Sequence, residues 1–286
     1  MKGSCPKHGF QLPNKPEMLE KDQKMDHSNR WIIKTRREQP DLGMRFYPQK
    51  KRIWAGFMFE DVISNKYWNQ YVNETYPDFQ QYLLNEAGDP IAVAQALPLT
   101  WDGTMAGLPV GWNDCFLRAA ADIEAGRLPN TLAGLEIAIQ PEYHGQGISY
   151  RMIEALRDKA REHAFQAVIV AVRPSWKMRY PLAPMERYIR WKREDGAPFD
   201  PWLRAHWRSG GEILKIAHPS MLIEGSIEQW EEWTGLMFPE SGDYVVPEAL
   251  VPVNIDLDMN IGRYIEPNVW VHHPITTKRL TPPQFT

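Results

Sequence analysis

The strongest constraint on the fold is a strand, a loop and a helix in the middle of the chain, followed closely by another strand. Residues 132–139 predict the first strand, and residues 167–172 predict the second, whose apolar and β-branched composition is typical of a strand buried on both faces. Between them, one apolar residue in every four predicts a helix from Gln146 or Gly147 to His163. This arrangement indicates a parallel strand pair joined by a right-handed crossover.

The clearest chemical signal lies in the loop before this helix, which reads Pro141-Glu142-Tyr143-His144-Gly145-Gln146-Gly147-Ile148-Ser149. Its two glycines allow a positive φ and a close approach of the backbone to a ligand. The first N–H groups of a helix have no partner inside the helix, and together with the helix dipole they favour a bound anion. The loop therefore predicts an anion site, and a pyrophosphate is the candidate ligand.

Two common nucleotide motifs do not fit this loop. A P-loop needs a lysine directly after its last glycine, and none follows Gly147. The dinucleotide fingerprint needs a third glycine where Tyr150 stands, and an acidic residue after the next strand, where Arg173 stands. These departures disfavour ATP bound through a P-loop and NAD bound through a dinucleotide fold.

The loop resembles the acyl-CoA-binding motif of the GNAT superfamily of N-acetyltransferases, Arg/Gln-x-x-Gly-x-Gly/Ala. His144 stands at the Arg/Gln position, Gly147 at the invariant glycine and Ser149 at the final position, so both outer positions depart from the pattern. The resemblance covers about residues 52–217 and is strongest over residues 132–172. It implies that acetyl-CoA or another acyl-CoA is the cosubstrate. The residues implied to bind it are Ile137, Ile139, His144, Gly145, Gln146, Gly147, Ile148 and Ser149.

The resemblance also implies an α/β fold, in which a mixed sheet with a splayed central parallel strand pair is flanked by helices. Residues 1–51 are expected to form a basic N-terminal extension. Residues 52–235 are expected to form the GNAT-like core, with an insertion near residues 174–200. Residues 236–286 are expected to form a C-terminal extension that completes the sheet or packs on it.

Periodicity and turn residues predict the remaining elements less sharply. Irregular chain is expected over residues 100–130. The other expected elements are a first strand at residues 53–59, a helix over 65–76 capped by Ser64, strands at 79–84, 91–99, 212–217 and 268–272, and helices over 201–209 and 227–234.

Glu136, on the strand before the loop, is the candidate general base. Acyl transfer to an amine needs the neutral amine, and an alkyl ammonium with a pKa near 10.4 lies about three pH units from that form at pH 7. Apolar neighbours on the strand suggest that burial raises the pKa of the Glu136 carboxyl. The competing interpretation is a strand-end carboxylate satisfied by a neighbouring residue.

His206 is the candidate general acid that protonates the leaving thiolate. The resemblance implies this role, because the family often places a tyrosine four residues before a Gly-Phe pair, and here His206 precedes Gly210-Gly211 by that spacing. An imidazole can donate a proton near neutral pH. Tyr180 and Tyr188 are rival donors, and a capping or core histidine is the competing interpretation.

Composition narrows the remaining possibilities. The net charge is −3, with a net of +7 on residues 1–52 and −10 on the rest, which disfavours a general nucleic-acid binder. No apolar run approaches the length of a membrane span, no secretory signal is evident, and two cysteines make no disulfide framework. A cytoplasmic location is the expectation. Asp256 and Asp258, or His272 and His273, lack the spacing of a metal site, so no metal is expected.

The sequence therefore predicts an acyl-CoA-dependent N-acyltransferase that acetylates an amine of a small molecule by direct attack. Neither a nucleic acid nor a membrane is expected as a partner, and a homodimer is possible. Because three motif positions depart from the family pattern, a non-catalytic acyl-CoA-binding or regulatory protein remains the alternative. A decarboxylase or an oxygen-acyltransferase on the same scaffold is a third hypothesis.

Overall fold

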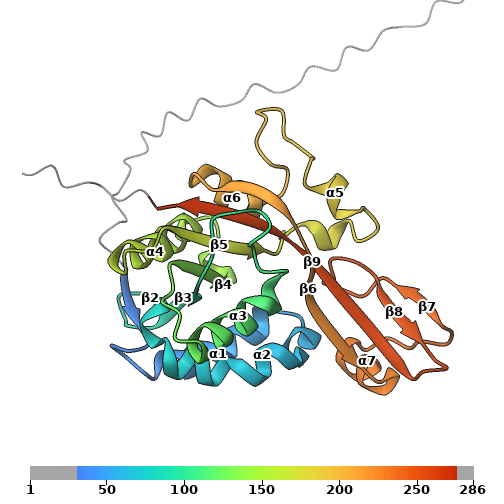
Figure 1. The fold of residues 1–286 in the computed structure, drawn as a ribbon. Helices are drawn as coiled ribbons and strands as arrows, with labels where there is room; N and C mark the ends of the chain where they lie inside the picture. The colour runs from blue at the N-terminus through green and yellow to red at the C-terminus, as the bar shows by residue number, and fades with distance from the viewer. Residues whose placement is uncertain (1–30, 276–286) are drawn as a thin grey trace, which may run out of the picture.

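The computed structural model describes residues 31–275 of the protein. A single mixed sheet runs through this part of the chain (Figure 1). Its strands in chain order are β1 (Ile32–Thr35), β2 (Gln80–Leu84), β3 (Pro90–Leu99), β4 (Thr131–Ile139), β5 (Ala167–Val172), β6 (Glu212–Gly225), β7 (Gly242–Tyr244), β8 (Val253–Asp256) and β9 (Ile261–Pro274). The spatial order is β1-β2-β3-β4-β5-β9-β8-β7, and β6 also pairs with β9. Neighbouring strands are antiparallel except β4 and β5, which are parallel.

Helices cover both faces of the sheet (Figure 1). The α-helices are α1 (Leu42–Ile53), α2 (Val62–Tyr67), α3 (Trp112–Glu124), α4 (Ile148–Glu162), α5 (Met185–Tyr188), α6 (Pro201–Arg208) and α7 (Ile227–Thr234). The shorter elements are the 3-10 turns η2 (Gly56–Glu60), η4 (Pro77–Phe79), η5 (Pro141–Tyr143) and η6 (Lys177–Arg179), and the π-helix η3 (Trp68–Thr75). The helices α1, α2 and α3 lie on one face, and α4 and α6 lie on the other (Figure 1).

The parallel pair at the centre of the sheet separates halfway along β4. Pairing runs from Thr131 opposite Ala167 to Gly134 opposite Val170, and beyond Gly134 only β3 pairs with β4. A Cβ at Gly134 would lie 3.0 Å from Val170 Cγ2, so the two strands are close at the last paired position. The predicted fold class, with its splayed parallel pair, is confirmed.

A β-bulge in β4 changes which face its side chains take. Gly134 pairs with Ala96 and Glu136 pairs with Gln95, so Leu135 is an extra residue on the bulged strand. Leu135 packs in the core beneath α3, and Glu136 beside it faces the same side of the sheet, toward α1. Strict alternation would have placed Glu136 on the α4 face.

The expectation of a strand at residues 53–59 is wrong. This segment contains the last residue of α1 and the turn η2, whose Phe57 packs against Trp230 and Tyr264 with ring centroids 5.6 and 5.4 Å apart. The apolar residues that suggested a strand therefore pack in two separate hydrophobic clusters. The predicted helix after it exists as α2 and η3, but Asp61, rather than Ser64, provides the side-chain cap.

Residues 100–130 are not irregular throughout, because they contain α3. The helix begins after Gly111 and buries Phe116, Ala119 and Ala120 against the sheet. Four glycines flank this helix, so the sequence favoured irregular chain and its apolar periodicity was not recognised. The other expected strands and helices are confirmed, although β6 and β9 extend well beyond the segments predicted for them.

The regions flanking the predicted core join the same sheet where the structure describes them. β1 pairs with β2, α1 packs over β3 and β4, and the expected boundary at residue 51 falls inside α1. At the other end, β9 pairs with β5, β6 and β8. The parts of the predicted extensions at residues 1–30 and 276–286 lie outside the described residues.

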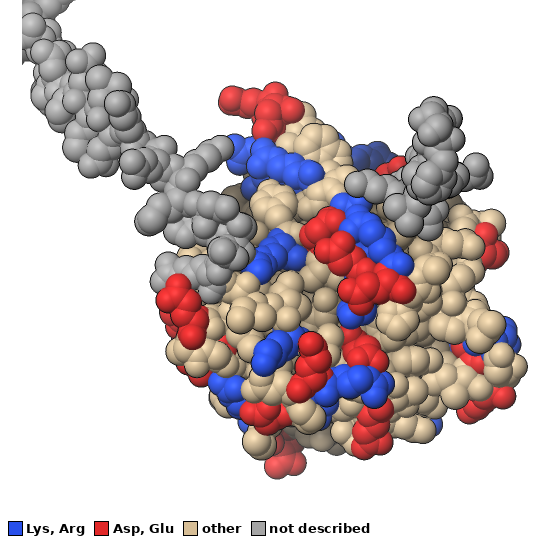
Figure 2. Space-filling view, turned by 90° about the vertical axis from the view of Figure 1, so that its left-hand side faces the viewer, with Lys and Arg blue, Asp and Glu red and all other residues tan. Residues whose placement is uncertain are grey.

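Charges of both signs are mixed on the face of the protein shown in Figure 2. Lys and Arg are interspersed there with Asp and Glu, and no large area carries a single sign. Within residues 31–275, no helix has the length and apolar character that crossing a bilayer requires.

Candidate active site

A cavity of about 1120 Å³ opens where β4 and β5 separate. One part is lined by the loop before α4 and by residues of β4, β5 and α6, and another by α1, α2 and η3 on the opposite face of the sheet. The opening between the strands therefore connects the two faces. Splaying of β4 from β5 is what makes this space available inside an otherwise continuous sheet.

The loop at the start of α4 presents unpaired backbone donors to the cavity. Gly145 and Gly147 have φ values of 78° and 77°, and a Cβ at either position would meet no atom within 4 Å. These glycines are therefore required for backbone conformation rather than for space. The His144 amide donates to the Pro141 carbonyl at 3.1 Å, whereas the amides of residues 145–149 donate to no acceptor in the described part of the chain.

The structure brings nearly all of the predicted cofactor-binding residues to this cavity. Gln146 does not line it, and its side-chain amide lies 3.4 Å from the Glu142 carbonyl. The predicted residues that line the cavity are Ile137, Ile139, His144, Gly145, Gly147, Ile148 and Ser149. His144 Nε2 lies 3.1 Å from the carbonyl oxygen of Ile139, so this ring helps to hold the loop against the end of β4.

Glu136 lies in the part of the cavity nearest α1. Its Oε1 accepts a hydrogen bond of 2.6 Å from the Trp54 indole, and its Oε2 pairs with Lys50 Nζ. Lys50 also donates to the side-chain oxygen of Gln95, and its Nζ lies 4.8 Å from the centre of the Trp68 ring. The side chain of Glu136 is only 7% exposed, so the carboxylate is both within the cavity and satisfied by neighbours.

His206 does not reach the cavity. It is fully buried, its Nδ1 lies 2.9 Å from His273 Nε2, and it is absent from the cavity lining although its neighbour Ala205 contributes. Burial lowers the pKa of His206 well below its usual value, so it is neutral at pH 7. This geometry does not support the predicted role of His206 as a proton donor to a leaving thiolate.

The rival tyrosines are also absent from the cavity lining. Tyr188 donates to Asp200 at 2.8 Å, and burial raises the pKa of its hydroxyl. Tyr180 packs among the rings of the inserted segment, with its centroid 5.0 Å from that of Trp191. Tyr82 does line the cavity, and burial raises its pKa to about 12.

Sequence reasoning missed the partners of Glu136. Lys50 and Trp54 come from the end of α1, and the prediction of α1 failed because Pro48 stands inside it, where a helix normally loses a hydrogen bond. The apolar pair Leu42 and Phe46, four residues apart and both buried, was the available signal for this helix. No local pattern indicates that Lys50 meets Glu136, 86 residues away.

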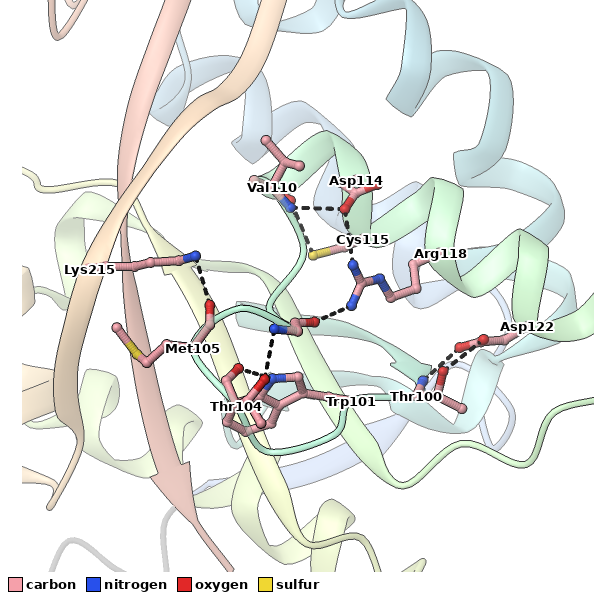
Figure 3. Close-up of polar contacts among 12 residues, drawn as sticks. Thr100, Trp101, Thr104, Met105, Val110, Asp114, Cys115, Arg118, Asp122 and Lys215 are labelled. Atoms are coloured by element: carbon pink, nitrogen blue, oxygen red, sulfur yellow. Dashed lines mark hydrogen bonds and ion pairs between the residues drawn. The ribbon is translucent and has the colours of Figure 1, made fainter.

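A smaller cavity of about 430 Å³ lies beside the loop between β3 and α3 (Figure 3). Its Arg118 is held by the Gly107 carbonyl and by Asp114 at 3.5 Å, and the Trp101 indole donates to Thr104 at 2.9 Å. It contains none of the predicted site residues. Across residues 31–275, no cluster of three or more His, Cys, Asp or Glu side chains is arranged to hold a metal ion.

Comparisons with known proteins agree with this geometry. Residues 51–179 match the model of the Acetyltransferase (GNAT) family. The chain is 30% identical over 277 residues to the arginine N-acetyltransferase avaD of Aspergillus versicolor, covering 86% of this chain and 94% of the relative. The loading GNATL domain of CurA from Lyngbya majuscula has the same fold, with a TM-score of 0.55 and 16% identity over 86% of this chain and 98% of that one. The loop, the splayed strands and these matches together place the chain in the GNAT family of N-acetyltransferases.

Proposed function

We propose that this acetyltransferase binds acetyl-CoA between β4 and β5 and transfers the acetyl group to a nitrogen of a small cationic molecule, with arginine as the first candidate. The observation that carries the proposal is a single cavity lined at one end by Gly145 and residues 147–149 of the loop with the free amides, and at the other by Glu136.

The loop supports the placement of the cosubstrate. Five consecutive amides, from Gly145 to Ser149, and the positive end of the α4 dipole suit the two negative charges of a diphosphate. One anion at a helix end contributes about 0.3–2 kcal/mol, while micromolar affinity requires about 8 kcal/mol. The pantetheine arm must supply much of the rest, and the separated strands offer it the main chain near Ile137 and Ile139.

The opposite end of the cavity supports a cationic acceptor. Glu136 provides a carboxylate, and the rings of Tyr47, Trp54 and Trp68 line the space around it. Carboxylates and aromatic faces both favour ammonium and guanidinium groups. The relative from Aspergillus versicolor is described as an arginine N-acetyltransferase, which makes arginine the first molecule to test.

Direct attack requires few groups from the protein. The acceptor nitrogen loses a proton to Glu136, directly or through water, and its lone pair forms a bond to the thioester carbonyl carbon. The carbon–sulfur bond then breaks, and the coenzyme leaves as a thiolate that takes up a proton. Because His206 lies outside the cavity lining, we assign no residue to that last protonation.

The test measures CoA release with a panel of amines, beside calorimetric binding of acetyl-CoA. Arginine is expected to be acetylated, and product mass distinguishes nitrogen from oxygen transfer or decarboxylation. Acetyl-CoA binding without turnover of any amine would instead favour the non-catalytic alternative.

Glu136→Gln is expected to lower kcat by about a hundredfold, within the range found for lost acid–base catalysis, while leaving acetyl-CoA affinity nearly unchanged. Glu142→Gln is the matched control, because Glu142 is exposed and pairs with Arg52 outside the cavity lining. An equal loss in both variants would contradict the role of Glu136 as base.

A cytoplasmic location and a possible homodimer remain predictions from the sequence.

A further inference from the structure

A cation from the chain itself already occupies the Glu136 carboxylate. Lys50 Nζ contacts Glu136 Oε2 and Gln95 Oε1 and lies 4.8 Å from the centre of the Trp68 ring. A carboxylate, an amide oxygen and the face of an indole are three kinds of group that bind ammonium and guanidinium ions. Contacts from β4, β3 and η3 thus converge on one position for a cation.

Lys50 reaches this position from the last turn of α1, and its side chain is 13% exposed. The ammonium is carried on a flexible four-carbon stem, so it can leave while α1 keeps its place. If it left alone, the buried carboxylate of Glu136 would lose its countercharge, which is costly. A second cation that takes the vacated contacts removes that cost.

We propose that Glu136, Gln95 and Trp68 form the subsite in which the cationic group that will be acetylated binds before Glu136 takes its proton, and that Lys50 is an internal competitor which the acceptor displaces. This inference rests on the proposed function and names the group of the acceptor that the cavity recognises. An ammonium or guanidinium restores the contacts that Lys50 gives up, whereas a neutral group leaves Glu136 without a countercharge. Lys50 thereby selects for charged acceptors.

The competition has a measurable consequence. The apparent Kd of an acceptor equals its intrinsic Kd divided by the fraction of molecules in which Lys50 has vacated the subsite. If that fraction is about one in ten or less, removing the ammonium tightens binding by about tenfold or more. A purely structural ion pair between Lys50 and Glu136 predicts no such gain.

The test compares binding of L-arginine and L-citrulline to the wild-type protein and to Lys50→Met by calorimetry. Methionine keeps an apolar stem of similar length, and citrulline replaces the guanidinium with a neutral ureido group. We expect Lys50→Met to bind arginine about tenfold or more tightly. If only arginine binds more tightly to Lys50→Met, its guanidinium occupies the subsite. If citrulline gains the same affinity, the α-ammonium that both molecules carry occupies it. Unchanged or weaker arginine binding overturns the proposal, and so does a failure of arginine to bind either protein.

Lys51→Met is the matched control, because Lys51 is exposed on the same helix and its Nζ lies 5.2 Å from the centre of the Tyr47 ring rather than at Glu136. It is expected to bind arginine as the wild type does. Acetyl-CoA binding and thermal melting show whether Lys50→Met is folded, and Lys50→Gln replaces it if it is not. Turnover of the amine panel without tighter binding in the Lys50 variant rejects the subsite alone, whereas absence of turnover with every amine rejects the proposed function.

Discussion

Gly147 has two roles at the start of α4, one conformational and one chemical. Its φ of 77° lies in the left-handed region, and its amide belongs to the row of free donors facing the cavity. A side chain there strains the backbone, and a carboxylate also repels a diphosphate. The resemblance to the family motif is therefore explained at this position by physical requirements that no other residue type meets.

Gly147→Asp is expected to weaken acetyl-CoA binding by at least about a hundredfold, equivalent to about 2.7 kcal/mol. Calorimetry measures the affinity directly. Gly126→Asp is the matched control, since Gly126 also has a positive φ, of 62°, with no atom near its missing Cβ, and it does not line the cavity. A folded Gly147→Asp protein with unchanged affinity would refute the loop assignment.

Trp112 contacts the bulge of β4 that orients Glu136. Its indole donates a hydrogen bond of 2.8 Å to the carbonyl of Leu135, the extra residue that turns Glu136 toward α1. Trp112→Phe removes that donor but keeps a ring against Phe116, whose centroid lies 4.9 Å away. We expect kcat to fall by up to about tenfold, because one hydrogen bond contributes about 1 kcal/mol, with little change in acetyl-CoA affinity.

Trp101→Phe is the comparison for that experiment. The indole of Trp101, like that of Trp112, donates a hydrogen bond to a backbone carbonyl. Its acceptor is Thr104, in the loop beside the smaller cavity (Figure 3). It is expected to lose a similar amount of stability while keeping its kcat. Equal losses of kcat in the two variants would show that the bulge contact has no special role.

At the scale of elements, α6 packs on β9 through two neutral histidines. Burial lowers the pKa of His273 to about 4 and holds the pKa of His206 well below its usual value. Unfolding returns each histidine to a pKa near 6.5, so the unfolded chain binds more protons below that pH. The stability that these residues contribute is therefore present above about pH 6.5 and is lost as the pH falls toward 4.

We expect His273 alone to lower the free energy of unfolding by about 3 kcal/mol between pH 7 and pH 4. Urea unfolding at pH 7, 5.5 and 4 measures this loss. His273→Gln removes the titrating group, so its stability should fall less steeply over the same range. The explanation fails if the two proteins show the same slope.

At the scale of the whole molecule, β9 joins the two halves of the sheet. Its residues 269–274 pair with β5 on one side, while residues 262–272 pair with β6 and residues 261–263 with β8. Without β9, the buried strand β5 would present an unpaired edge beside the cavity. β9 thus helps to hold β5 in position where β4 diverges from it.

Trp270→Ala is expected to lower the free energy of unfolding by about 3–5 kcal/mol, because Trp270 is fully buried in the core beneath α3. Chemical denaturation measures the change. Trp207→Ala serves as the control, since Trp207 on α6 is 46% exposed. A loss of similar size in both would mean that β9 is not central to the core.

The sequence alone determined the strand, loop, helix and strand of residues 132–172, because hydrophobic periodicity and the glycines of the loop act locally. It also selected Glu136 and nearly all of the loop residues that the structure places in the cavity lining. It missed α1, which contains Pro48, and α3, which has glycines before and after it.

Only the tertiary structure decided which groups meet at the candidate active site. The face that Glu136 takes depends on one extra residue opposite β3, which no alternation of apolar residues predicts. Lys50 and Trp54 reach Glu136 from 86 and 82 residues away. The packing of α6 against β9 likewise buries His206 outside the cavity lining. Local sequence fixes what a segment can form, but the close packing of distant segments fixes which side chains face one another.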